Sequence, residues 1–167
     1  KEMCRQPLAR GYFKYGTDNN YKPTHYEWVD DPRGIINIYE RCKSYNPYVV
    51  GGDTAGEGSD SFTAQMLDTL TGTQVASLKY EGSNELYYSQ QMYCLGMMYN
   101  QALMAIETNF STYPQRKLEE WNYDKFYIRE SYDNYTHKLK PSFGFRTTTA
   151  SRPAILANLQ SIIKETP

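Results

Sequence analysis

Cysteine and histidine are scarce in this chain of 167 residues, which holds three cysteines and two histidines. Cys4, Cys42 and Cys94 lie far apart and lack metal-ligand spacing, so we expect free thiols in a reducing compartment. His25 and His137 are also far apart in the sequence, which argues against a zinc site built from Cys and His ligands. An oxygen-rich site for magnesium or manganese stays open.

Long apolar runs are also missing. None approaches the roughly 20 residues that are needed to span a bilayer, and no secretory signal precedes the domain, so we expect no membrane partner. The first residue is Lys1 rather than Met, and we therefore expect the chain to have been cut from a longer polypeptide. A length of 167 residues, with 40% hydrophobic and 22% charged residues, fits one soluble globular domain.

Basic residues are nearly absent from the middle of the chain. Residues 44–110 hold one, Lys79, against seven acids, which gives −6. Residues 1–43 hold eight basic and six acidic residues (+2), and residues 111–167 hold nine and six (+3). An acidic centre with mildly basic flanks suits a metal site that works on a polyanion. Ordinary surface charge explains the same counts equally well.

The hydrophobic periodicity predicts an α/β domain, with a mixed sheet covered by helices. The expected elements are a strand at 48–53, a hairpin of 62–69 with 74–80, a helix at 85–99, a strand at 102–107, a short helix after Ser111, a strand at 125–129, a loop or exposed hairpin at 130–145, and an amphipathic helix after Ser151. The strand–helix–strand crossover predicts a parallel pair in the second half. Residues 1–46 are interpreted as a lead-in or linker segment that packs on a domain at 47–167.

Two of the expected strands end on a carboxylate. Asp53 follows an apolar pair and two glycines, and Glu107 follows the apolar run 102–106. If these strands are neighbours, roughly 4.8 Å apart, the two carboxylates share one edge of the sheet. Adjacent anions repel unless something neutralises them, and a divalent cation is the usual answer. The pattern favours a metal-dependent hydrolase; the alternatives are a turn aspartate that bonds its own backbone and a solvated edge glutamate.

Three further residues are candidates for the same chemistry. Asp60 either completes an acidic metal-binding loop with Glu57 or only helps to turn the chain into the hairpin. Arg146 and Arg152 flank a threonine-rich loop before a helix, where they either bind a phosphate backbone or lie on the surface without a ligand. The glycine-rich stretch 51–58 lacks a Gly-Lys-Ser/Thr ending and is acidic, so we do not expect it to bind nucleotide phosphates. No Gly-x-Ser-x-Gly elbow supports Ser/His/Asp catalysis.

Four short motifs follow one another along the chain. They are YVVGGDTAGEGSDS at 48–61, AIETN at 105–109, GFRTT at 144–148 and SRP at 151–153. Their order and spacing resemble the nuclease domain of the large terminase subunit of tailed bacteriophages, which has a ribonuclease H-like fold. The resemblance runs from about Ile36 to the end of the chain. It implies a mixed β-sheet with helices on both faces.

The resemblance also implies a function: a two-metal-ion endonuclease that cuts concatemeric double-stranded DNA during genome packaging. The metal-binding acids of the family map onto Asp53 and Glu107, with Asp60 as a further candidate ligand, and the implied cofactor is Mg²⁺ or Mn²⁺, with two ions in the complete domain. The implied partners are double-stranded DNA, an upstream terminase ATPase domain, the small terminase subunit and the portal. The implied location is the cytoplasm of the infected or lysogenic bacterial host.

The chain departs from the family pattern in two places. The family usually has a third acid in a His/Asp-rich segment beyond the last helix, whereas this sequence stops at Pro167 just after that helix. The segment that follows Glu107 also lacks a glycine that is often seen in relatives. We therefore expect the domain to be truncated at its C-terminus, and the fragment to bind metal weakly and cut poorly or not at all.

Two other functions compete with this interpretation. The first is another ribonuclease H-like nuclease, of the junction resolvase or transposase type. The second is a non-catalytic module that docks DNA or the portal, in which the acids serve only structure. A metal titration distinguishes the two nuclease interpretations, in which the acids bind metal, from the non-catalytic docking module.

Overall fold

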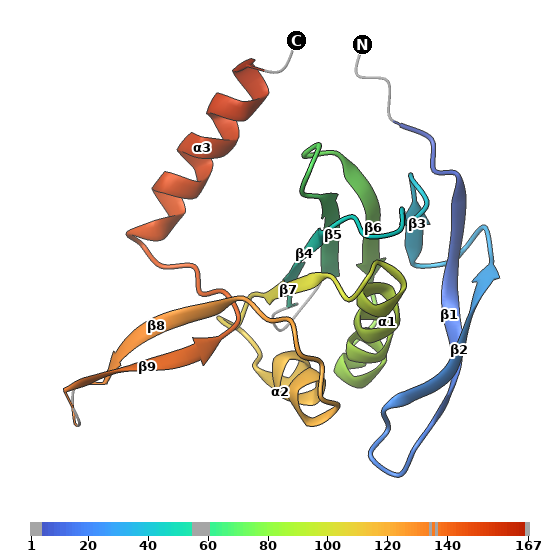
Figure 1. The fold of residues 1–167 in the computed structure, drawn as a ribbon, viewed down its shortest axis with the longest axis horizontal. Helices are drawn as coiled ribbons and strands as arrows, with labels where there is room; N and C mark the ends of the chain where they lie inside the picture. Colours follow the sequence, from blue (N-terminus) through green and yellow to red (C-terminus); the bar gives the residue numbers. More distant parts are fainter. Residues whose placement is uncertain (1–4, 55–60, 134, 136, 166–167) are drawn as a thin grey trace.

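The structure is a computed structural model, and it describes residues 5–54, 61–133, 135 and 137–165. A seven-stranded sheet with strand order β2-β1-β3-β6-β5-β4-β7 forms its centre (Figure 1). The strands are β1 (Ala9–Thr17), β2 (Pro23–Asp30), β3 (Ile36–Ile38), β4 (Tyr48–Asp53), β5 (Phe62–Asp68), β6 (Gln74–Tyr80) and β7 (Leu103–Ile106). The pairing of β4 with β7 is parallel and the other pairs of the sheet are antiparallel, so the sheet is mixed.

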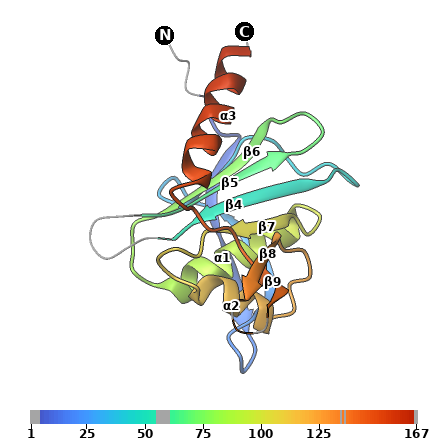
Figure 2. The ribbon, with the colours of Figure 1, turned by 90° about the vertical axis from the view of Figure 1, so that its left-hand side faces the viewer.

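Helices lie on both faces of this sheet. Helices α1 (Glu85–Met98) and α2 (Tyr113–Glu120) lie on one side, and α3 (Ser151–Glu165) rises from the other (Figure 2). A separate two-stranded hairpin of β8 (Ile128–Asp133) and β9 (Lys138–Phe143) projects beside β7 (Figure 1). The predicted α/β class, with a mixed sheet and helices on both faces, is confirmed.

Strict alternation of side chains fixes which residues of the central strands face the core. Along β5, Phe62, Ala64 and Met66 are buried, while the residues between them lie on the opposite face. The same period of two holds for β4, where Val50 is buried and Asp53 is exposed. The face away from α1 therefore receives the polar side chains of these strands.

Helix α1 is buried on all sides rather than along one stripe, because every residue from Tyr88 to Gly96 is buried. The sheet curls so that β1 and β2 pass alongside this helix (Figure 1). The Gln91 side chain bonds both the N–H and the C=O of Phe13, at 2.9 and 2.8 Å. The polar side chain of Gln91 on this buried helix is thus satisfied by hydrogen bonds to the backbone of β1. Asn84 caps the helix by accepting from Tyr87 N–H at 2.9 Å.

The N-terminal segment contributes more to the sheet than its sequence pattern indicates. Strands β1 and β2 were not predicted, and β1 joins the rest of the sheet by pairing with β3. The segment interpreted as a lead-in therefore packs on the domain by strand pairing, and the boundary at residue 46 stays a prediction. The strand expected at 125–129 is replaced by a single bridge between Phe126 and Met104, after which the hairpin begins.

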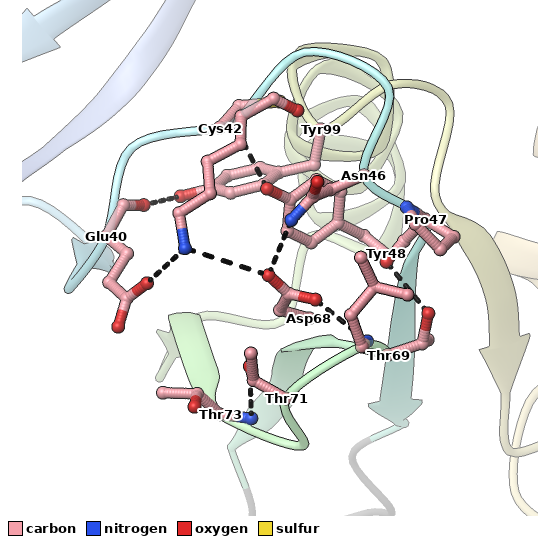
Figure 3. A network of polar contacts seen from close by, with 12 residues as sticks. Glu40, Cys42, Asn46, Pro47, Tyr48, Asp68, Thr69, Thr71, Thr73 and Tyr99 are labelled. Atoms are coloured by element: carbon pink, nitrogen blue, oxygen red, sulfur yellow. Dashed lines mark hydrogen bonds and ion pairs between the residues drawn. The ribbon is translucent and has the colours of Figure 1, made fainter.

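A buried carboxylate, Asp68, stabilises the end of the β4–β5 pair that is farthest from Asp53 (Figure 3). Asp68 is fully buried; it accepts from Leu70 N–H and from the Asn46 side chain, both at 2.9 Å, and its Oδ2 lies 4.0 Å from Lys43 Nζ. Burial alone would raise the pKa of Asp68, but these hydrogen bonds and the nearby lysine outweigh it and hold the pKa below its usual value. The carboxylate is therefore a structural anion.

The described part of the chain contains two free thiols, at Cys42 and Cys94, whereas Cys4 lies outside the described residues. Burial raises the pKa of the Cys94 thiol to about 12, so this thiol stays protonated and unreactive at neutral pH. Among the described residues, no helix is both long and apolar enough to cross a membrane.

Candidate metal centre and nucleic-acid interface

Asp53 is the last residue of β4, and it lies on the outer face of the sheet. The preceding residue, Gly52, is buried, and a Cβ there would lie 2.6 Å from the Tyr88 hydroxyl oxygen. Glycine is therefore needed at position 52 because Tyr88 packs against the strand. At Gly51 a Cβ would meet nothing within 4 Å, so only one glycine of the pair is required by packing.

Glu107 directly follows β7, the strand that pairs with β4. Gly52 lies opposite Ile106 in the parallel register, and Glu107 N–H donates to Gly52 C=O at 2.7 Å. One further step of this register brings Asp53 beside Glu107, on the same face and on strands roughly 4.8 Å apart. The two predicted acids are thus neighbours at one edge, as the sequence pattern required.

Both acids open into one cleft of about 790 Å³ between the outer face of the sheet and the start of α3. Its lining residues are Asp53, Thr54, Ser61, Thr63, Lys79, Glu107, Asn109, Phe110, Phe145, Thr147, Arg152, Ile155 and Leu156. The described lining holds two carboxylates and two cationic side chains, Lys79 and Arg152. Such a cleft suits a ligand that carries both negative charge and apolar surface.

The segment around Phe145 returns from the hairpin and forms a short added strand beside the end of β7. Glu107 pairs with Phe145 in a parallel bridge, in which Phe145 N–H donates to Ile106 C=O at 2.8 Å and Thr108 N–H to Phe145 C=O at 2.9 Å. The Asn109 side chain then bonds the C=O and the N–H of Thr147, at 2.7 and 3.1 Å. Two motifs that lie some 40 residues apart are thereby locked together at the cleft.

Gly144 makes this return possible. Its φ is +79°, a left-handed conformation that residues with a Cβ rarely adopt. A Cβ at this position would lie 2.8 Å from Ile106 C=O and from Thr108 Cγ2. The glycine thus supplies both the turn and the close approach that set Phe145 beside Glu107.

The two arginines predicted to bind DNA lie in different places. Arg152, in the first turn of α3, lines the cleft, whereas Arg146 is exposed and does not line it. The start of α3 is fixed by Thr148 and Ser151, whose side chains each accept the other's backbone N–H, at 3.0 and 2.9 Å. This reciprocal pattern is that of a capping box, and it holds Arg152 at the mouth of the cleft.

The charge of Asp53 acts on the core beneath it. Burial raises the pKa of the Tyr88 phenol far above its ordinary value, and the negative charge of Asp53 raises it further. The phenol therefore stays neutral, and its hydroxyl donates to Thr63 C=O at 3.0 Å. Tyr88 thus supports the β4–β5 pair directly under the acids.

The donor chemistry of this edge fits a hard divalent cation. Two carboxylates on neighbouring strand ends offer the oxygen ligands that Mg²⁺ and Mn²⁺ take. Within the described ranges, no group of three Cys, His, Asp or Glu side chains is gathered for a metal. The third candidate, Asp60, lies outside the described residues, as does Glu57.

Sequence reasoning missed several residues of the cleft, above all Lys79, Thr63 and Asn109. The alternation around Leu78, which is buried, already sends Lys79 to the outer face, but only the strand register brings it into line with the acids. The Asn109 side chain donates to Thr147 C=O. No local signal indicates that pairing, because it depends on the return of the chain after the hairpin.

No family model matches the sequence and no curated protein matches it. Among solved structures, the chain is similar to the large terminase nuclease of the thermophilic phage G20c. Against the magnesium-bound form the TM-score is 0.58 at 14% identity, covering 77% of this chain and 60% of that one. The cobalt-bound form gives 0.57 at 15% with the same coverage, and a further structure of that nuclease gives 0.50 at 20%, covering 55% and 49%.

The chain thus spans about half to three fifths of the length of the solved structures that it matches. At these identities the likeness establishes the fold, and it confirms the resemblance that the motifs predicted. The chain has the ribonuclease H-like fold of large terminase nuclease domains.

Proposed function

We propose that this chain is the metal-dependent DNA endonuclease domain of a phage terminase large subunit, which cuts concatemeric double-stranded DNA during genome packaging. The observation that carries the proposal is the position of Asp53 and Glu107, which end neighbouring parallel strands on one face and open into one cleft. The fold shared with the G20c nuclease, which has been solved with bound magnesium and with bound cobalt, supports it.

Asp53 and Glu107 would hold Mg²⁺ or Mn²⁺, with two ions in the complete site and Asp60 as a further ligand. When bound, such ions neutralise charge on a phosphodiester and lower the pKa of water, so that water can act as the nucleophile. The contribution of the protein is to fix the two carboxylates. The Glu107–Gly52 hydrogen bond and the Phe145 bridge hold both strand ends, so little reorganisation is needed when the ligands bind.

The cationic side chains would bind the DNA backbone. Arg152, on α3, lines the cleft with the acids, and Arg146 lies outside the cleft on the segment that returns from the hairpin. Contacts of this kind position a duplex through its phosphates and read little sequence. In the full assembly the partners would be a terminase ATPase domain, the small subunit and the portal, in the cytoplasm of the bacterial host.

A nicking assay on supercoiled plasmid with Mn²⁺ tests the proposal. Asp53→Asn and Glu107→Gln should each slow nicking about 100-fold or more, since even the loss of an outer-shell partner of a metal ligand costs about 10- to 100-fold. Glu27→Gln is the matched control, because Glu27 is an exposed acid on β2 and its loss changes the net charge equally.

Two results would count against the nuclease. If Asp53→Asn nicked the plasmid at the rate of the parent, the assignment of Asp53 as a metal ligand would be wrong. Tight duplex binding without cutting in Mg²⁺ or Mn²⁺ would favour the docking module instead.

A further inference from the structure

Four side chains form a row across the outer face of the sheet, here termed the cleft row: Glu107, Asp53, Thr63 and Lys79. Asp53 lies opposite Thr63 in the β4–β5 pair, and Thr63 lies opposite Lys79 in the β5–β6 pair. Glu107 extends the row on the other side through the parallel register with β4. All four residues line the same cleft. The row runs across the strands, with two anions at one end and a cation at the other.

Lys79 is singular in the charge pattern of the chain. It is the only basic residue between positions 44 and 110, a stretch that holds seven acids. Its neighbour Leu78 is buried against the core, so the alternation of β6 sends Lys79 to the cleft face. The one positive charge of the acidic centre therefore lies in the cleft with Asp53 and Glu107.

The spacing of the row decides what Lys79 can reach. Two strand intervals separate it from Asp53, about 10 Å along the sheet. This separation is between the backbones, and the Lys79 ammonium itself lies beside Glu81. From there it can bind a phosphate of the same strand next to the one that a cation at Asp53 and Glu107 would hold. Lys79 is therefore suited to positioning the DNA.

The ion pair that Lys79 makes does not compete strongly with such a role. Its Nζ lies 2.7 Å from Glu81 Oε1, and both side chains are exposed, at 63% and 75%. Exposed pairs of this kind contribute little and are exchanged at small cost for a phosphate. Glu81 is two residues further along the chain and does not line the cleft.

We propose that Lys79 is a positioning residue that binds a backbone phosphate of the DNA strand on the β6 side of the scissile bond. The inference rests on the proposed nuclease function, since it takes DNA as the ligand of the cleft. It adds a direction: the bound strand runs along the cleft row, from the acids on β7 and β4 towards β6.

The test is duplex binding by fluorescence anisotropy in Ca²⁺, which takes the same oxygen ligands, over a series of salt concentrations. Lys79→Gln should weaken binding about 3- to 10-fold and lower the slope of log K against log salt by about 1, the amount for one phosphate contact. Lys79→Arg should restore most of the affinity. Lys14→Gln is the matched control: Lys14 is an exposed strand lysine paired to Glu27 at 3.8 Å, away from the cleft.

Equal effects of Lys79→Gln and Lys14→Gln would overturn the inference, because they would report only net charge. An unchanged salt slope, or a parent that does not bind the duplex, would overturn it as well. Nicking in Mn²⁺ provides a second readout, in which Lys79→Gln should raise KM and leave kcat within about 2-fold. A failure of the nuclease proposal alone would look different. Asp53→Asn would then nick at the rate of the parent, while Lys79→Gln would still bind the duplex more weakly.

Discussion

Gly52→Ala places a methyl group between the sheet edge that carries Asp53 and Glu107 and the core, and its cost in stability can be worked out from the contacts. The new Cβ would lie 2.6 Å from the Tyr88 hydroxyl oxygen and 3.3 Å from Ile106 Cγ1 and Met92 Cε. An ordinary contact is 3.4 Å or more, so the hydroxyl must retreat by nearly 1 Å. Tyr88 is fully buried and cannot swing into solvent. Overpacking of this kind costs roughly 1–3 kcal/mol, and we expect about 2 kcal/mol.

The companion variant Tyr88→Phe removes the atom that clashes. It also removes the hydrogen bond to Thr63 C=O (3.0 Å), which costs about 1 kcal/mol. The double variant should be destabilised by about 1–2 kcal/mol less than the sum of the two single variants, because the methyl group then has room. Gly51→Ala, with nothing within 4 Å of its new Cβ and no positive φ, should raise stability by about 0.4–1 kcal/mol, because alanine restricts the unfolded chain more than glycine does.

Urea unfolding followed by tryptophan fluorescence measures all four variants. A loss of about 2 kcal/mol corresponds to a fall in Tm of roughly 4–8 °C for a chain of this size. Equal stabilities for Gly51→Ala and Gly52→Ala would refute the packing argument. So would a strictly additive cycle between Gly52 and Tyr88.

Two further predictions concern Gly144, which precedes the Phe145 bridge, and Asp68, at the end of the β4–β5 pair that is farthest from Asp53. Gly144→Ala should lower the free energy of unfolding in urea by about 2 kcal/mol, because alanine is strained at φ +79° and its Cβ would lie 2.8 Å from Ile106 C=O. An unchanged stability would contradict the role of Gly144 in bringing Phe145 beside Glu107. Asp68→Asn should lower Tm at pH 7, because the pKa of Asp68 is depressed in the folded state and the stabilisation is present above the unfolded pKa of about 3.9. The gap in Tm between parent and variant should therefore close as the pH falls below about 4, and a gap that widens on acidification would contradict the assignment.

The sequence predicts the central strands well because they obey a simple period. Strands β4 and β5 alternate between the core and the outer face, β6 does so from Ala76 onward, and the Gly72 turn joins β5 to β6. The acids at positions 53 and 107 could be found for the same reason, since Asp53 ends a strand in which Tyr48 and Val50 are buried and Glu107 directly follows the strand β7. Their pairing follows from the parallel crossover.

Other parts of the fold depend on contacts that no local pattern records. Strands β1 and β2 are rich in polar and aromatic residues, and only their packing around α1 explains them, through bonds such as Gln91 to Phe13. The cleft is closed by Phe145 and Thr147, which return from far along the chain. Lys79 enters the site through strand register alone. The positions of these residues are therefore set by contacts between distant parts of the chain, which the periodicity of the sequence does not reveal.

The central claim is that Asp53 and Glu107 hold a common metal, and the thermal shift produced by Mn²⁺ tests it most directly. At a Mn²⁺ concentration of 100 times Kd, binding to the folded state should stabilise the parent by about 2.7 kcal/mol, which is a rise in Tm of several degrees. Asp53→Asn and Glu107→Gln should each abolish that rise, while Glu27→Gln should keep it. A rise of parental size in either cleft variant would contradict the shared metal site.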